Sequence, residues 1–101
     1  MPSLQQLERL LVVDPQDAFV LYAIAQEHAK QGRHADAVAF YDRCLGVNAE
    51  YCYAYYHKAR SLEASGDRSG ARAALEAGLA AAKAAGDAKA LSEISGYLSA
   101  L

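Results

Sequence analysis

A pattern of small and large residues repeats in this chain after 34 positions. Gly32 and Gly66 lie 34 residues apart, and an alanine stands seven residues before each of them, at Ala25 and Ala59. A fixed repeat of this length is typical of solenoids, in which pairs of helices stack on one another. Such stacks present an extended surface to their partners. The pattern therefore predicts a binding surface and not a catalyst.

The composition is that of one folded, all-α domain. The chain has 101 residues, of which 53% are hydrophobic and 22% are charged, and this balance is typical of globular and not of disordered chains. It is rich in alanine, which loses no side-chain entropy in a helix, and its two prolines, Pro2 and Pro15, lie near the start. We expect a single domain over residues 1–101, which is long enough to build one core.

The charge and the apolar pattern exclude several classes of function. The formal net charge of −2 offers no basic footprint for nucleic acid. No run approaches the ~18 consecutive apolar residues of a membrane span. The segment from Met1 to Gln6 lacks the charged and apolar regions of a signal peptide. We therefore expect a cytoplasmic protein that binds neither nucleic acid nor membrane.

The reactive side chains form no catalytic or metal-binding motif. Cys44 and Cys52 are too few for a disulfide framework, and their spacing fits no zinc site. Cys52 and His57 are five residues apart, which places them on different faces of a helix. The glycines of residues 66–70 follow no strand and are interpreted as part of a turn, not as a phosphate loop. We expect a non-catalytic protein with reduced cysteines, no metal site and no cofactor.

Apolar spacing, capping residues and helix breakers divide the chain into helical ranges. Ser3 and Gln6 have the spacing of a capping box, and Gly32 is placed to end a helix in the left-handed conformation. The residues Asp14-Pro15 are expected to end one helix and start the next, and Asn48 is expected to cap the helix that follows it. The predicted helices span residues 3–12, 16–31, 34–47, 49–65, 68–85 and 87–101. The short loops between them predict antiparallel neighbours.

This arrangement resembles the tetratricopeptide repeat family, whose pattern places large and small residues at set offsets. Residues 18–51 match a first repeat and residues 52–85 a second. The matching positions are Leu21, Ile24, Ala25, Gly32, Ala37, Tyr41 and Cys44, then Tyr55, Ala59, Gly66, Ala71, Leu75 and Gly78. The departures from the pattern are His28, Ala49, Lys58 and Lys83.

The resemblance extends to both ends of the chain. Residues 3–15 resemble the closing half of an earlier repeat, and residues 87–101 resemble a capping helix that follows a two-residue insertion. The resemblance implies an all-α, right-handed superhelix of antiparallel helix pairs, similar to a tetratricopeptide solenoid, with about five helices.

The resemblance also implies a binding site for a protein or peptide partner. In this family the first helix of each repeat lines a concave groove, which typically binds an extended peptide or a partner's helix. Carried over to this chain, the groove positions are Phe19, Tyr22, Ala23, Gln26 and Lys30, then Tyr53, Tyr56, His57, Arg60 and Glu63. The expected surface is a ladder of aromatic rings edged by Gln26 and Arg60. We expect an adaptor or scaffold that recruits another protein through this groove.

The charges of the groove suggest the chemistry of its ligand. Lys30, Arg60 and a protonatable His57 make the groove mildly cationic, so we expect an acidic or carboxylate-ended segment. The carboxylate clamp that holds chaperone tails in some family members is absent, because Tyr22, Gln26 and His57 stand at its positions.

Two other interpretations of the groove residues and of the chain are compatible with the sequence. In one, the groove tyrosines only cover the inner face of the solenoid and contact one another. In the other, the chain is a structural self-association module that forms a weak homodimer. That contact would use apolar residues near the two ends of the chain: Leu4, Leu7, Leu11, Leu98 and Leu101.

Overall fold

The computed structural model describes residues 2–101 and is all helical over that range. The helices are α1 (Leu4–Val13), α2 (Ala18–Lys30), α3 (His34–Val47), α4 (Cys52–Ala64), α5 (Arg68–Ala85) and α6 (Ala88–Ala100). Met1, the first residue of the expected domain 1–101, lies outside the described residues. The six ranges expected to be helical all form separate helices, so the expected total of about five is one too low.

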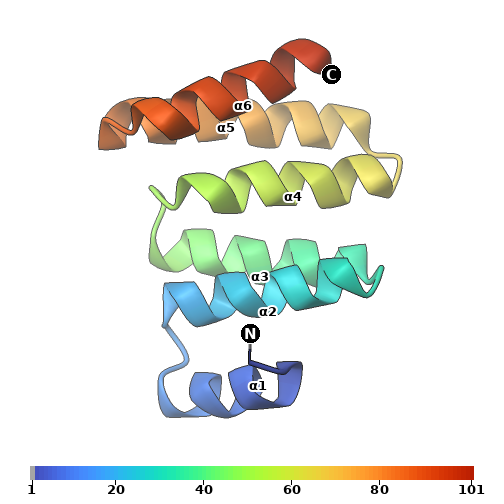
Figure 1. Ribbon diagram of the computed structural model, residues 1–101, viewed down its shortest axis with the longest axis vertical. Helices are drawn as coiled ribbons and strands as arrows, with labels where there is room; N and C mark the ends of the chain where they lie inside the picture. Colours follow the sequence, from blue (N-terminus) through green and yellow to red (C-terminus); the bar gives the residue numbers. More distant parts are fainter. Residues whose placement is uncertain (1) are drawn as a thin grey trace.

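The helices are stacked as antiparallel pairs, which confirms the predicted solenoid (Figure 1). Helix α2 pairs with α3, and α4 pairs with α5. Helices α2, α4 and α6 lie next to one another and form one face of the molecule, because α4 contacts both of the others. Helices α1 and α6 lie at opposite ends of the stack. Two helices of this layer, α2 and α4, carry the predicted groove residues.

Gly32 has the predicted left-handed backbone conformation, and two further turn glycines share it. Gly32, Gly66 and Gly86 have φ angles of 78°, 86° and 68°, which lie in the left-handed region that glycine adopts without steric cost. The predicted capping box is also present, because the Ser3 side chain accepts from the Gln6 N–H and the Gln6 side chain accepts from the Ser3 N–H. The sequence therefore predicts these helix ends correctly.

Two helix starts differ from the expectation. Helix α4 begins at Cys52 with Tyr51 as its N-cap, and Asn48 is instead the C-cap of α3. Helix α2 likewise begins at Ala18, after its N-cap Asp17. In both places the chain first makes a turn, in which the N–H of Tyr51 donates to the Asn48 carbonyl at 3.1 Å and that of Asp17 donates to the Asp14 carbonyl at 3.3 Å. This turn uses the residues that were expected to open the helices.

Small residues lie where the paired helices cross. Ala25 and Ala37 of the first pair, and Ala59 and Ala71 of the second, are all fully buried. Their size allows the helix backbones to approach closely, and larger neighbours fill the space beside them. The prediction that these alanines mark the helix crossings is consistent with their burial.

The N-terminal helix is held by one buried side chain. Leu7 is 1% exposed and packs with Val20, Ala23 and Ile24 of α2. It is therefore not free for a contact between chains, as the self-association interpretation had supposed. The apolar side chains that α1 does expose are Leu10, Val12 and Val13.

Candidate functional site

Three aromatic residues of the predicted groove, Tyr22, Tyr56 and His57, form a cluster between α2 and α4. The Tyr22 ring lies 5.8 Å from the His57 ring and 4.8 Å from the Tyr51 ring, measured between centroids. His57 also contacts Tyr56 edge to face, at 5.2 Å. Gln26 donates from Nε2 to the Tyr22 hydroxyl at 3.1 Å. These contacts restrict the orientations of the rings, which would lower the entropy cost of binding a ligand.

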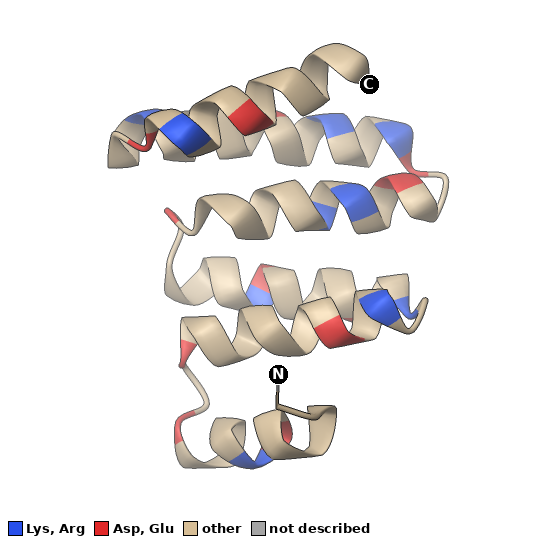
Figure 2. Ribbon diagram, viewed as in Figure 1, with Lys and Arg blue, Asp and Glu red and all other residues tan. Residues whose placement is uncertain are grey.

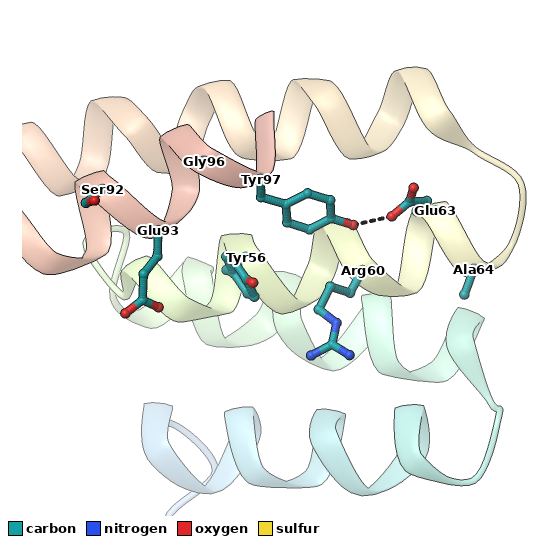
Figure 3. A pocket seen from close by; sticks show the side chains of 8 residues that line it. All are labelled: Tyr56, Arg60, Glu63, Ala64, Ser92, Glu93, Gly96 and Tyr97. Atoms are coloured by element: carbon teal, nitrogen blue, oxygen red, sulfur yellow. Dashed lines mark hydrogen bonds between the residues drawn. The ribbon is translucent and has the colours of Figure 1, made fainter. Parts of the chain in front are cut away.

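A groove lies between α4 and α6 (Figure 3). Its volume is about 630 Å³, and its lining consists of Tyr56, Arg60, Glu63, Ala64, Ser92, Glu93, Gly96 and Tyr97. The Tyr56 and Tyr97 rings meet edge to face with 5.3 Å between their centroids. The Tyr97 hydroxyl donates a hydrogen bond to the Glu63 carboxylate. Two tyrosine rings from different helices therefore form the apolar part of this groove.

A second hollow, of about 440 Å³, lies between α2 and α4. Gln26, Lys30, His57 and Arg60 contribute to its lining, and so does the buried ring of Tyr41. Arg60 and Ala64 line both hollows. The two hollows therefore adjoin at Arg60, and both lie on the face formed by α2, α4 and α6.

The charges are distributed unequally over this face. Arg60 is exposed and forms no ion pair with the residues of the range 2–101. Lys30 pairs with Glu27 at 3.6 Å between Nζ and Oε1. Glu63 and Glu93 lie on the α6 side of Arg60 (Figure 3). A carboxylate of a ligand would therefore find its most available partner at Arg60.

His57 does not add to the positive charge at neutral pH. Burial lowers the pKa of His57 below its ordinary value of 6.5, and the neighbouring Arg60 lowers it further. The imidazole is therefore neutral at pH 7, and the groove is less cationic than the sequence suggested. Burial raises the pKa of Tyr22 to about 12 and raises the pKa of Tyr97, so both hydroxyls stay protonated and can donate hydrogen bonds.

The structure does not bring all the predicted residues together. Phe19 is 65% exposed, lies at the start of α2 and lines neither hollow. Tyr53 contacts Tyr56 with 6.5 Å between ring centroids but also lies outside both hollows. Ala23 is buried. The expected ladder of rings is therefore interrupted at Phe19.

Several groove residues of α6 were missed by the sequence prediction. Advancing Tyr56, His57 and Arg60 by 36 residues, the repeat of 34 plus the two-residue insertion, gives Ser92, Glu93 and Gly96. All three line the groove, so the register contained a signal for them. Tyr97 had no such signal, because the equivalent position in the preceding pair is the buried Ser61.

Comparisons with known proteins identify the fold independently. A model of the tetratricopeptide repeat matches residues 20–51. The solution structure of a tetratricopeptide repeat domain protein from Salinibacter ruber is 30% identical in sequence, with a TM-score of 0.77, and the match covers 84% of this chain and 86% of that one. The chain belongs to the tetratricopeptide repeat family. Its fold is that of a protein–protein interaction module, since stacked repeats of this kind present concave binding surfaces.

Other solved structures share the fold of this tetratricopeptide repeat protein. A Bordetella parapertussis protein is 26% identical with a TM-score of 0.82, and the match covers 97% of this chain and 85% of that one. The MamA protein is 19% identical with a TM-score of 0.76, which shows the fold alone; the match covers 79% of this chain but only 44% of MamA. No curated protein matches the sequence. In residues 2–101, no helix is long and apolar enough to cross a membrane.

Proposed function

We propose that this tetratricopeptide repeat protein is a non-catalytic adaptor that binds a peptide or a helix of another protein across α2, α4 and α6. The observation that carries the proposal is the groove between α4 and α6, in which Tyr56 and Tyr97 lie beside Arg60. Its volume of about 630 Å³ falls within the ~300–1,000 Å³ of typical ligand sites. The carried-over groove residues Phe19 and Tyr53 belong to this proposal only as outer contacts.

The residue types of the groove suit protein recognition. Tyrosine and arginine are enriched among the residues that dominate binding energy at protein interfaces. A tyrosine ring offers a large contact area and a polar tip, and few of its rotamers are lost on binding. Tyr56 and Tyr97 are half-buried and in mutual contact, so their orientations are already restricted. The partner would place an apolar side chain against these rings.

The position of Arg60 suggests how the proposed ligand is oriented in the groove. It is the unpaired cation at the junction of the two hollows, whereas Glu63 and Glu93 lie on the α6 side. A ligand would therefore place a carboxylate near Arg60 and its apolar residue toward Tyr97. This placement agrees with the expectation of an acidic or carboxylate-ended segment. It assigns the carboxylate to one position, beside Arg60.

The test uses a peptide selected for binding from a random display library, labelled with a fluorophore. Its dissociation constant is measured by fluorescence anisotropy against the unaltered protein and against the variants Tyr56→Ala and Arg60→Ala. Removing a central tyrosine or arginine costs roughly 1–2 kcal/mol or more at an interface. We therefore expect each variant to bind at least about fivefold more weakly.

The matched control is Arg72→Ala. Arg72 is an exposed arginine of α5 that lines neither hollow, so its removal should leave the dissociation constant unchanged. Far-UV circular dichroism checks that all three variants remain helical. Equal binding by the two groove variants and the control would place the site elsewhere and refute the proposal.

A further inference from the structure

The groove between α4 and α6 has a carboxylate on one side of the Tyr56 ring and a cation on the other. In Figure 3 these groups are Glu93 of α6 and Arg60 of α4. Glu93 is exposed and forms no ion pair with the residues of the range 2–101. The other groove carboxylate, Glu63, accepts the hydrogen bond of the Tyr97 hydroxyl. Glu93 is therefore the more available carboxylate for a bound molecule.

Tyrosine rings surround the Glu93 end of the groove. Burial raises the pKa of Tyr53, and the carboxylates of Glu93 and Asp87 raise it further, which places both carboxylates near the Tyr53 hydroxyl. Tyr53 contacts Tyr56 with 6.5 Å between ring centroids, and Tyr56 contacts Tyr97 with 5.3 Å. The faces of such rings attract cations, and a carboxylate pairs with them. This combination of groups suits a positively charged ligand group.

The balance of charge in the groove also favours a cation at Glu93. Two of the charged residues that line the groove are acidic and one, Arg60, is basic. Helix α6 carries one acidic and one basic residue, Glu93 and Lys89 (Figure 2). Lys89 lines neither hollow and, within residues 2–101, forms no ion pair with Glu93. A cationic group of a ligand would therefore be attracted to Glu93 and repelled by Arg60.

Arg60 is far enough from Glu93 for both charges to act on one ligand. Tyr53, beside Glu93, precedes Arg60 by seven residues of α4. At 1.5 Å per residue this corresponds to roughly 10 Å along the helix axis. The distance is close to the Debye length of about 10 Å at 0.1 M ionic strength, so Arg60 weakens the attraction at Glu93 only slightly.

We propose that the groove between α4 and α6 binds a lysine or arginine side chain of the partner, with its aliphatic stem against Tyr56 and Tyr97 and its cationic group at Glu93. This inference rests on the proposed function and specifies the apolar side chain that the partner places against the rings. Lysine and arginine bury such stems on apolar surface while the charged group stays in water. With the partner's carboxylate at Arg60, the two charges lie about three residues apart in an extended peptide, at ~3.3 Å per residue.

The test begins with peptides selected against the unaltered protein from a random display library. It uses those peptides whose binding is weakened by both Tyr56→Ala and Arg60→Ala. Each should contain a lysine or arginine about three residues from a carboxylate. Replacing that lysine by norleucine, or that arginine by citrulline, removes the charge and keeps the stem, and should raise the dissociation constant about three- to tenfold. Peptides without a basic residue, or equal binding by the neutral peptide, overturn the inference.

Glu93→Gln locates the contact, because it removes the charge of the side chain and keeps its size. It should weaken binding of the charged peptide about three- to tenfold and leave the dissociation constant of the neutral peptide unchanged. Glu76→Gln is the matched control, since Glu76 is an exposed carboxylate of α5 that lines neither hollow. The control should bind both peptides like the unaltered protein. Equal losses for Glu93→Gln and Glu76→Gln, or losses that multiply between Glu93→Gln and the neutral peptide, overturn the contact.

The outcomes separate this inference from the function on which it rests. If no selected peptide depends on Tyr56 and Arg60, the groove is not the binding site and both proposals fail. If such peptides bind but show no coupling to Glu93, only the basic side chain is refuted. Far-UV circular dichroism checks that Glu93→Gln and Glu76→Gln remain helical, and both side chains are exposed in the chain.

Discussion

At the scale of single residues, the spacing of the helices is set by the smallest side chains. Gly78 is buried in α5, where an added Cβ would lie 2.9 Å from the Tyr55 Cβ and 3.2 Å from the Ile94 Cδ1. The first of these distances is shorter than any ordinary carbon contact, so α4 or α5 would have to move. Gly46 of α3 is different, because an added Cβ there meets nothing within 4 Å. Gly46 and Gly78 therefore have different reasons to be present.

This difference predicts opposite effects on stability for the same substitution at Gly78 and Gly46. Gly78→Ala should destabilise the chain, because overpacking costs roughly 1–3 kcal/mol and outweighs the ~1 kcal/mol gained in helix propensity. Gly46→Ala should stabilise it by roughly 0.5–1 kcal/mol, since only the propensity term applies. The free energy of unfolding in urea measures both effects. A stabilising Gly78→Ala would show that the contact with Tyr55 relaxes without cost.

At the scale of helices, the starts of the elements are capped unequally. Asp67 accepts a hydrogen bond from the Gly70 N–H at 2.8 Å and caps α5. Asp17 and Asp87 cap α2 and α6 in the same way. Arg33, which occupies the position of Asp67 in the first pair, makes no side-chain cap for α3. The second helix of the second pair, α5, therefore has a capping bond that the second helix of the first pair, α3, lacks.

The unequal caps predict unequal responses to the same substitution. Asp67→Ala should lower the free energy of unfolding by ~1 kcal/mol, the usual cost of losing an N-cap. Arg33→Ala should change it by less than half of that amount, because no cap is removed and the side chain is exposed. Thermal and urea unfolding of the two variants compare them directly. Equal losses would mean that the cap at Asp67 contributes nothing to stability.

At the scale of the whole molecule, stability depends on the neighbours that each helix has. Helix α1 packs only against α2 and has one buried residue, Leu7. Helix α4 packs against α2, α3, α5 and α6. In a stack of this kind the stability of each unit is close to the sum of its own and its neighbour terms. The end helix should therefore open without the rest of the chain.

Hydrogen exchange can measure this gradient. At a concentration where the chain is monomeric, amides of α1 should exchange with the lowest opening free energy and those of α4 with the highest. Native-state exchange followed by NMR gives the value for each amide. The same opening free energy for α1 and α4 would instead identify the chain as one cooperative unit.

The sequence predicted the elements better than it predicted the site. The 34-residue repeat placed the helices, the turn glycines and the buried alanines, because each of these depends on local spacing along one helix or turn. It misplaced the starts of α2 and α4, where Asp14 and Asn48 are the C-caps of α1 and α3 and take part in turns instead of opening the next helices. The sequence also placed Phe19 in the groove, but Phe19 lines neither of the two hollows. A position on one helix face does not fix the distances to residues of other helices.

The sequence by itself determined the repeat, the helical pairing and the small residues at the crossings. Only the tertiary structure decided that Tyr97 faces Tyr56 and that Arg60 lines both hollows. The physical reason is that side-chain periodicity specifies which face of a helix is buried. The contacts across helices depend instead on the rotation and offset of whole helices, which the two-residue insertion before α6 changes.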